Sequence, residues 1–538
     1  MRTEKAVGSV AYATAPEDNP SDKHGTVQDM MDMWRVGRDQ ELNVSDCRYI
    51  LRVAYTEMIN GLQRNFRFLS VLGFSAVLMC TWEAVLFSGP LTIKTRAPTS
   101  GGQYHWVSEF APRSCQKPLS YITGWVCVLG WHTGIAGCSY TVANMLVGVI
   151  AINYPDSYTY EPWHVTLLVI AVAVVALMFN TFLAQKLPLI EGVILIVHCF
   201  GFFGILIPLW VLSPSVAPSE VFGSIEDRGD WGSNGLSCLV GLVGPIYALI
   251  AEEIQDASRV LPQGMIWTLI LNGATGFVMI VTYAFCVGNI DEVLESQTGF
   301  PFIQVFLNST GSVKAATGMT VVIMVMQFCA AISNVATTSR QVYAFARDQG
   351  LPFSGILCQV RMCTFLPWQR NKGNIRGRME KVSDSCCLHS DLLQISPTFT
   401  VPLNALFLSL IIVSLLSLIN IGSSVAFNAI MSLGTAALLS SYIISISCVR
   451  LRRWRDQPLP PARWSMGKFT PVIDSISILV LMVIFVFSFF PVTRHVTAQS
   501  MNWSIVIFSG VTLFAMAYYH AYARKVYRGP VERVRLVE

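Results

Sequence analysis

The stretch GLVGPIYALIAEEIQDASRVLP, residues 241–262, begins as an apolar helix sequence and then runs into two adjacent glutamates. The apolar run 236–251 would cover only about 24 Å as a continuous helix, less than the hydrocarbon thickness of about 30 Å. Gly241, Gly244 and Pro245 can interrupt this helix, and an interrupted segment exposes backbone N–H and C=O groups to a polar solute. A Gly/Pro kink that packs against neighbouring helices is the alternative.

The composition indicates a protein that crosses the membrane several times. Of its 538 residues, 53% are hydrophobic and only 13% are charged, whereas about 25% of a soluble domain is charged. The formal net charge is only +4, and the basic residues lie in short clusters between apolar runs, so nucleic acid is not an expected partner. The 14 cysteines show neither a CxxC pair nor a metal-ligand spacing, which indicates small packing residues.

Eleven apolar runs are candidates for membrane spans. Ten of them are long enough to cross the hydrocarbon core as helices, and the eleventh is the shorter run of the opening stretch. They lie at 69–91, 119–152, 164–183, 189–212, 236–251, 264–288, 318–338, 403–421, 425–449, 471–490 and 503–523.

Basic residues in the loops predict the orientation of these spans, because Lys and Arg gather on the cytoplasmic side. Counting back from the basic C-terminal tail, every second loop holds no basic residue or only one. The single basic residues are Arg494, Lys314 and Arg228. Both the C-terminus and the N-terminal tail are therefore expected in the cytoplasm. The segments on both sides of the first span carry basic residues, so either 69–91 is a re-entrant hairpin or one span is missing after it.

Three longer motifs carry a resemblance to a known family. They are APTSGGQYHWVSEFAP at 97–112, EEIQDASRVLP at 252–262 and SNVATTSRQVYAFARDQGLPFS at 333–354. Together they resemble the amino acid-polyamine-organocation transporters, in particular the fungal branch of amino acid, choline and GABA permeases. The similarity runs from about residue 66 to 354 and again from 401 to 530.

This resemblance implies an all-α integral membrane fold of twelve spans, in which a five-plus-five inverted repeat is followed by two C-terminal helices. Helices 1 and 6 of such folds are unwound at their centres around the solute. The resemblance places the first unwound segment at 81–83 and the second at 241–247. It thereby implies a substrate site that includes Thr81, Trp82, Glu83, Trp131, Gly241, Val243, Gly244, Pro245 and Tyr247.

Several of these residues also have a purely structural explanation. Glu83 is a carboxylate in an apolar run, which is costly and usually functional, but an interfacial glutamate near a helix end is the alternative. Trp131 and His132 either line the solute cavity or serve as a packed ring and a satisfied polar contact. The segment 104–106 is expected to form an amphipathic cytoplasmic element rather than a ligand site.

The charged residues at the end of the opening stretch are expected to form a cytoplasmic gate or a helix-capping network. Solvated loop charge is the alternative for each of them. They are Glu252, Glu253, Asp256 and Arg259.

The chain departs from the family pattern at four places. The region 88–95 lacks the second half of helix 1 and all of helix 2, which leaves about eleven spans, and helix 6 is shortened after Ile250. The segments 44–61 and 360–397 are extra. Our hypothesis is that misplaced exon boundaries cause these gains and losses, and a genuinely diverged isoform is the alternative.

The expected domain organisation follows from these observations. Residues 1–68 form a cytoplasmic N-terminal tail, 69–523 form the transmembrane permease domain, and 524–538 form a cytoplasmic C-terminal tail. Within the permease domain, residues 355–400 are expected to be a disordered cytoplasmic insert, because they show no clean periodicity.

The expected function is secondary active transport of a small amino acid, GABA or a choline-like amine, coupled to protons as the family implies. The expected partners are this solute, H⁺ and the lipid bilayer of the plasma membrane or the vacuole, and no cofactor is expected. A transport-inactive or sensor-like membrane protein from a truncated or mis-spliced gene is the alternative. An enzyme is disfavoured, because the sequence contains no HExxH, GxSxG or Gly-rich phosphate motif.

Overall fold

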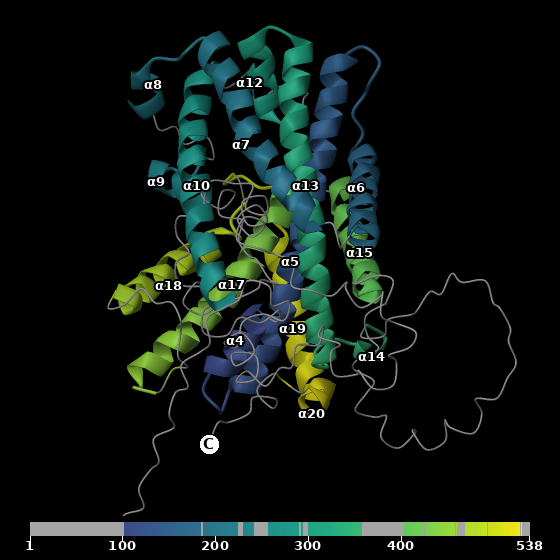
Figure 1. The fold of residues 1–538 in the computed structure, drawn as a ribbon, viewed down its shortest axis with the longest axis vertical. Coiled ribbons are helices and arrows are strands. Elements are labelled where there is room, and N and C mark those ends of the chain that lie inside the picture. Colours follow the sequence, from purple (N-terminus) through teal and green to yellow (C-terminus); the bar gives the residue numbers. More distant parts are fainter. Residues whose placement is uncertain are drawn as a thin grey trace, which may run out of the picture.

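A computed structural model shows an all-helical chain over the residues that it describes (Figure 1). These are residues 102–183, 187–223, 230–241, 257–289, 292–293, 300–357, 402–422, 425–457, 459, 469–491, 493–527 and 529. No strand occurs among them. The expected all-α class is therefore confirmed.

The described helices include long ones that run mostly near the vertical axis of Figure 1, with α17 and α18 lying obliquely, and several short ones between them. They are α4 (Gly102–Phe110), α5 (Gln116–Asn153), α6 (Pro162–Phe182), α7 (Leu187–Leu212), α8 (Pro218–Gly223), α9 (Asn234–Gly241), α10 (Ala257–Cys286), α12 (Pro301–Thr310), α13 (Val313–Arg347), α14 (Ser354–Leu357), α15 (Leu403–Ser417), α16 (Ile419–Gly422), α17 (Ala426–Trp454), α18 (Thr470–Phe487), α19 (Ser504–Tyr518), the π-helical turn η8 (Tyr519–Ala523) and α20 (Arg524–Val526).

Eight helices in the described ranges are long and apolar enough to cross a membrane. They are α5, α6, α7, α13, α15 with α16, α17, α18, and α19 with η8 and α20, and each lies on a predicted run. Helix α10 lies on the predicted run 264–288, and its apolar part, Gly273–Cys286, is shorter. The run 69–91 and most of 236–251 lie outside the described residues, so the count of eleven spans stays a prediction.

Helix α5 lies at the centre of the bundle and packs against both α13 and α17 (Figure 1). Glycines allow this close approach. A Cβ atom at Gly130 would lie 2.8 Å from the side chain of Leu438 in α17, and one at Gly124 would lie 2.3 Å from the Phe345 ring of α13. Because lipid provides no hydrophobic drive between helices, membrane helices associate through small residues of this kind.

Helix α4 differs from the amphipathic cytoplasmic element that the sequence predicts at 104–106. Eight of its nine residues are buried, including Tyr104, His105 and Trp106. The helix packs against α5 and α17, and Ser120 Oγ–H of α5 donates to the Tyr104 carbonyl at 2.8 Å. The prediction of an amphipathic element is wrong at 104–106, because α5, α17 and the end of α13 bury these three side chains.

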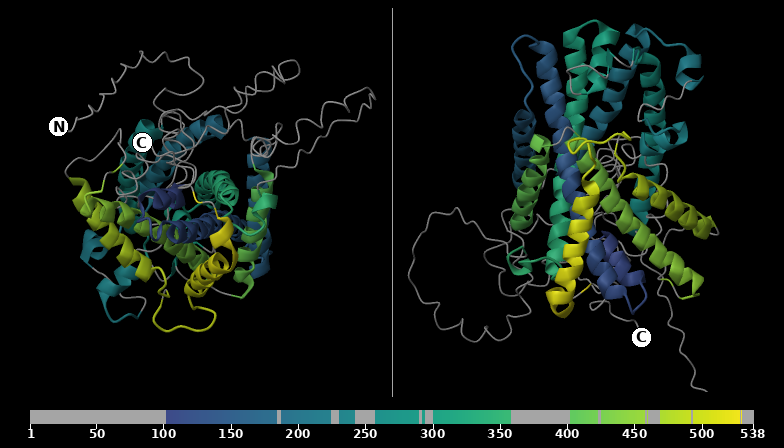
Figure 2. Two further views of the ribbon diagram at one scale, coloured as in Figure 1. Left: turned by 90° about the horizontal axis from the view of Figure 1, so that it is seen from below. Right: turned by 180° about the vertical axis from the view of Figure 1, so that it is seen from behind.

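The end of the last spanning helix turns into the core at the same end of the bundle as α4. Figure 2 shows the C-terminal helices running beside α5 and ending near α4. Tyr527, just after α20, is fully buried against Tyr121 and Phe345, although it belongs to the predicted tail 524–538. Of the predicted insert 355–400 only the end of α14 is described, and the predicted domain boundaries stay predictions.

Candidate functional site

Most residues of the predicted substrate site lie outside the described residues. Gly241 is the last residue of α9, and Arg259 lies in the first turn of α10. Trp131 lies near the middle of α5, so the part of the site that the structure describes is built around it. The predicted site and gate residues outside the described ranges are Thr81, Trp82, Glu83, Val243, Gly244, Pro245, Tyr247, Glu252, Glu253 and Asp256.

Trp131 packs between α5 and α17 and presents one unused hydrogen-bond donor. Its side chain is only 3% exposed and belongs to a buried cluster with Cys127 and with Tyr442 of α17. The Trp131 carbonyl accepts a hydrogen bond from Thr338 Oγ1 of α13 at 3.2 Å. The indole Nε1 is buried and has no hydrogen-bond partner among the described residues. The ring therefore contributes to packing while its N–H group stays unsatisfied.

His132 is buried beside Trp131 and is only partly hydrogen-bonded. Its Nδ1–H donates to the Val128 carbonyl at 2.6 Å. Because a carbonyl can only accept, this contact places the proton of a neutral ring on Nδ1 and leaves Nε2 as an acceptor. Nε2 is buried without a partner in the described ranges. The alternative of a satisfied polar contact requires both ring nitrogens to be hydrogen-bonded. In His132 only Nδ1 bonds to a described residue.

Helix α13 supplies further polar groups that the sequence analysis does not single out. Asn334 Nδ2–H donates to the Ala330 carbonyl at 2.9 Å and lies 3.5 Å from the Cys138 sulfur of α5. Thr337 is buried, and its Oγ1 has no partner in the part of the chain that the structure describes. The polar run SNVATTS at 333–339 is the signal for this face, because polar residues in a spanning helix usually face the bundle interior.

Helix α4 adds a buried amide next to the same face of α5. Gln103 Oε1 accepts a hydrogen bond from the Cys127 thiol at 3.7 Å, and the Gln103 carbonyl accepts one from Ser445 Oγ of α17 at 3.5 Å. Its Nε2 is buried and has no partner within the described segments. Cys127 and Trp131 are one helical turn apart on α5. Gln103 therefore contacts α5 one turn away from Trp131.

These atoms form a set of unused hydrogen-bonding groups inside a membrane bundle. Gln103 Nε2 and Trp131 Nε1 are donors, whereas His132 Nε2 is an acceptor. An unpaired buried polar group costs about 1–3 kcal/mol, and such groups usually have water or a functional partner. Each of these atoms can still make a hydrogen bond with a water molecule or a polar solute that reaches it. Over the described ranges, no group of three or more His, Cys, Asp or Glu side chains could hold a metal ion.

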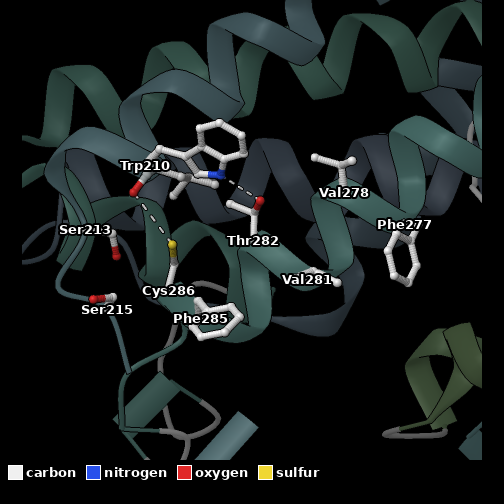
Figure 3. Close-up of a pocket in the computed structure, with 10 residues that line it drawn as sticks. Trp210, Ser213, Ser215, Phe277, Val278, Val281, Thr282, Phe285 and Cys286 are labelled. Carbon is white, nitrogen blue, oxygen red and sulfur yellow. Dashed lines mark hydrogen bonds between the residues drawn. The ribbon is translucent and has the colours of Figure 1, made fainter. Parts of the chain in front are cut away.

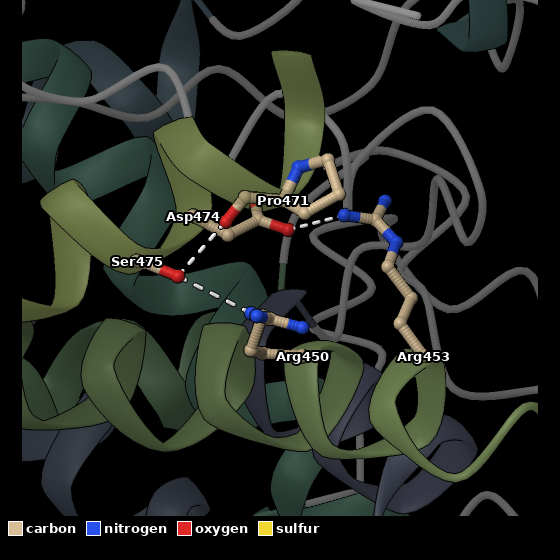
Figure 4. A network of polar contacts seen from close by, with 5 residues as sticks. All are labelled: Arg450, Arg453, Pro471, Asp474 and Ser475. Atoms are coloured by element: carbon tan, nitrogen blue, oxygen red, sulfur yellow. Dashed lines mark hydrogen bonds and ion pairs between the residues drawn. The ribbon is translucent and has the colours of Figure 1, made fainter. Parts of the chain in front are cut away.

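A separate polar cluster joins α17 to α18 at the basic end of α17 (Figure 4). Arg453 Nη1 donates to Asp474 Oδ2, and the Asp474 side chain is almost fully buried. Ser475 Oγ accepts a second hydrogen bond from Arg450 Nε at 3.2 Å. Positive side chains at this position also interact favourably with the negative, C-terminal end of the α17 dipole. The cluster holds α18 against α17 and is not part of the predicted substrate site.

Two further contacts hold α4 at this end of the bundle. Arg452 Nη1 of α17 donates to the Glu109 carbonyl at 3.0 Å. The Tyr104 hydroxyl donates to Asp348 Oδ2, just beyond α13, at 2.9 Å. The short helix α4 thus connects the ends of α13 and α17, which pack on different sides of α5.

Comparison with known proteins identifies similar sequences along most of the chain. Residues 68–511 match the model of a family described as amino acid permease. The choline transporter of Saccharomyces cerevisiae is 24% identical over 87% of this chain and 78% of its own length. The GABA-specific permease of the same yeast is 24% identical over 91% of this chain and 87% of its own length. Amino-acid permease 2 of Neurospora crassa is 26% identical, over 82% and 76% respectively.

Proposed function

Because this chain belongs to the amino acid permease family, we propose that it moves a small amino acid, GABA or a choline-like amine by secondary active transport. Family membership and the apolar spans make it an integral membrane transporter. The similar choline, GABA and amino-acid permeases support this range of substrates. Transport is coupled to protons, uses no cofactor, and takes place in the plasma or vacuolar membrane with both termini in the cytoplasm.

The set of unpaired polar atoms around α5 is the observation that carries this proposal. The carboxylate of an amino acid or of GABA, or the hydroxyl of choline, accepts a hydrogen bond from the Trp131 indole N–H. An amine N–H group donates to His132 Nε2 in the same interior. Such contacts satisfy buried groups that are costly when unpaired, so a bound solute stabilises the bundle around it.

The remaining predicted residues complete the proposed site. The segments 81–83 and 242–247, together with Gly241 at the end of α9, are proposed to supply backbone groups and the Glu83 carboxylate to the solute. Glu252, Glu253, Asp256 and Arg259 form the proposed cytoplasmic gate. In this mechanism one helix bundle rocks against the rest of the protein around the midplane site, so that the solute is exposed to one side of the membrane at a time.

Uptake by cells that lack their own amine and amino-acid permeases tests the proposal. Radiolabelled choline, GABA and neutral amino acids are offered separately to cells that produce the full chain. We expect saturable uptake of one of these solutes, and we expect a proton uncoupler to abolish its accumulation. Absence of uptake from a chain that reaches the membrane would argue against the proposed function.

A transport-inactive or sensor-like protein is the second candidate, and the gap near residues 88–95 favours it. The basic segments on both sides of the run 69–91 require either a re-entrant hairpin or a missing span. Sequencing of full-length cDNA across this region tests the alternative. A transcript that restores a second helix supports an ordinary permease, whereas a transcript that encodes this sequence as written, together with absent uptake, supports the inactive protein.

A further inference from the structure

The last turn of α12 carries the triplet NST at 308–310, which fits the acceptor pattern of N-linked glycosylation. This pattern is Asn-x-Ser/Thr, in which x is any residue except proline. Two other triplets fit it, at 43–45 and 502–504. The first of these two lies outside the described residues. The structure therefore allows a comparison of two candidate acceptors, Asn308 and Asn502.

The side chain of Asn308 is exposed and has an unused amide nitrogen. The next residue, Ser309, is buried, and its Oγ–H donates at 3.0 Å to Ser213 Oγ, just beyond the end of α7 (Figure 3). Asn308 is exposed instead, and its Oδ1 accepts a hydrogen bond from Gln304 Nε2 at 2.8 Å. Its Nδ2, the atom to which a glycan is attached, donates to none of the described residues. A glycan is bulky and needs such an open position.

The end of α12 is held in shape by other groups than Asn308 Nδ2. Gly311 ends the helix with a positive φ of 61°, and its backbone N–H donates to the Leu307 carbonyl at 2.9 Å. The Thr310 hydroxyl donates to the Phe306 carbonyl at 2.7 Å. A group attached to Asn308 Nδ2 therefore breaks no hydrogen bond among the described residues.

The charge pattern places the end of α12 on the side away from the cytoplasm. Figure 1 shows α12 at the end of the bundle opposite to α4 and α20. Basic residues occupy the last turn of α17, which contacts α4, and the last turn of α20. The loops that the sequence places on the other side hold only Arg228, Lys314 and Arg494. Because Lys and Arg gather on the cytoplasmic side, the end of α12 faces the lumen of the endoplasmic reticulum during synthesis, where N-linked glycans are attached.

Asn308 also stands clear of the hydrocarbon core. Helix α13, which follows it, has 35 residues. It is therefore about 52 Å long, whereas the core is about 30 Å thick. The apolar run of this helix, 318–338, begins ten residues after Asn308. The turn between α12 and α13 thus lies outside the membrane-embedded part of the chain.

Asn502 fits the same pattern in the opposite environment. It is only 6% exposed, and its Nδ2 donates to the Ser488 carbonyl at 3.1 Å and to the Phe490 carbonyl at 3.0 Å. A glycan would replace one of these amide hydrogens and add bulk at a buried position. Asn502 also directly precedes the apolar run 503–523, so it lies at the membrane surface. We therefore expect Asn502 to stay unmodified.

We propose that Asn308 carries an N-linked glycan. The donor is an oligosaccharide that is joined to a lipid through a diphosphate. Asn308 Nδ2 forms a bond to C1 of the first sugar, the bond between C1 and the diphosphate oxygen breaks, the diphosphate leaves with the electron pair, and one amide proton is released. The proposal rests on the orientation given with the proposed function, but not on which solute is transported.

Translation of the full chain in the presence of endoplasmic reticulum microsomes tests the modification. We expect one slower species on a denaturing gel, which a glycosidase specific for N-linked glycans converts to the faster form. Asn308→Gln should give only the faster form, whereas Asn502→Gln should keep the slower one. Because the gel is denaturing, this shift does not depend on the stability of a variant. Absence of the shift, or a shift that persists in Asn308→Gln, overturns the proposal.

A conservative pair at Thr310 tests whether the triplet itself is recognised. Thr310→Ser keeps the acceptor pattern and should keep the shift. Thr310→Val has nearly the same shape without the hydroxyl and should abolish the shift. The same result for both variants contradicts recognition of this triplet.

A labelling experiment separates failure of this proposal from failure of the proposed orientation. Asn308→Cys is translated into sealed microsomes and treated with a membrane-impermeant maleimide, and the unchanged chain gives the background from its own cysteines. If the turn after α12 faces the lumen, the extra label appears only after detergent opens the microsomes. Protection without glycosylation overturns the glycan alone. Extra label in sealed microsomes overturns the orientation and the glycan together.

Discussion

At the scale of single residues, the interior of the bundle combines tight packing with polar atoms whose partners are missing. Trp131 contributes a ring to the buried cluster and keeps an unused N–H group. Asp474, by contrast, is buried with its partner Arg453. Under the proposed function, we expect substitution of Trp131 to change solute binding. We expect substitution of Asp474 to change the stability of the fold.

Trp131→Phe removes the indole N–H and keeps an aromatic ring in the buried cluster that includes Tyr442. We expect the KM for uptake to rise about tenfold, since one hydrogen bond of about 1.4 kcal/mol to the solute is lost. Uptake kinetics, corrected for the amount of protein in the membrane, measure this change. Trp163→Phe at an exposed ring is the matched control and should leave KM unchanged. An unaltered KM in Trp131→Phe would exclude this indole from solute binding.

Asp474→Asn breaks the ion pair with Arg453 while nearly preserving the shape of the side chain. The guanidinium group then stays largely buried without its counter-ion, and we expect a loss of about 3 kcal/mol in the free energy of unfolding. A thermal melt of the detergent-solubilised protein detects this loss. Asp156→Asn in an exposed loop is the control. Equal melting temperatures for the two variants would show that the pair contributes little.

At the scale of elements, the length and hydrophobicity of the apolar runs determine where the spanning helices lie. The run 119–152 becomes α5, Gln116–Asn153, and the run 471–490 becomes α18, Thr470–Phe487. Apart from polar runs such as 333–339 in α13, sequence patterns do not predict which face of each helix meets a neighbour, because nearly all faces of these spans are apolar. In α5, the glycines that meet α13 and α17 determine the packing.

Gly130→Ala tests the close contact between α5 and α17. The added methyl group would lie 2.8 Å from Leu438 and 3.3 Å from the backbone nitrogen of the same residue, so we expect a loss of about 1–3 kcal/mol through overpacking. Gly204→Ala in α7 adds the same group where no atom lies within 4 Å, and better helix propensity should stabilise it by up to about 1 kcal/mol. Opposite shifts in melting temperature are expected, and equal shifts would contradict this packing.

At the scale of the whole molecule, one buried tyrosine ties the last spanning helix to the centre of the bundle. The Tyr527 hydroxyl lies 3.0 Å from Ser120 Oγ of α5. Its ring makes edge-to-face contacts with Tyr121 and Phe345, with centroid distances of 5.2 and 6.0 Å. Because Tyr121 belongs to α5 and Phe345 to α13, this single side chain joins three helices that are far apart in the sequence.

Tyr527→Ala should therefore loosen the C-terminal end of the protein. We expect a loss of about 3 kcal/mol from the emptied aromatic cluster and faster tryptic cleavage after Arg524 and Lys525. Tyr527→Phe should lose only about 1 kcal/mol, which corresponds to the hydrogen bond with Ser120. Tyr522→Ala at an exposed ring is the control for the cleavage rate. Cleavage at the same rate in Tyr522→Ala and Tyr527→Ala would contradict an anchoring role.

The sequence by itself determined that this chain is a helical membrane protein of the permease family. The length of an apolar run identifies a membrane span, and motifs such as 333–354 identify related proteins. Both inferences use a local stretch of sequence and need no knowledge of neighbouring helices. The tertiary structure alone decided that α4 is covered, that Tyr527 is an anchor, and that Trp131, His132 and Gln103 keep unpaired atoms. Burial and hydrogen-bond pairing depend on contacts between segments hundreds of residues apart, and no local pattern specifies those contacts.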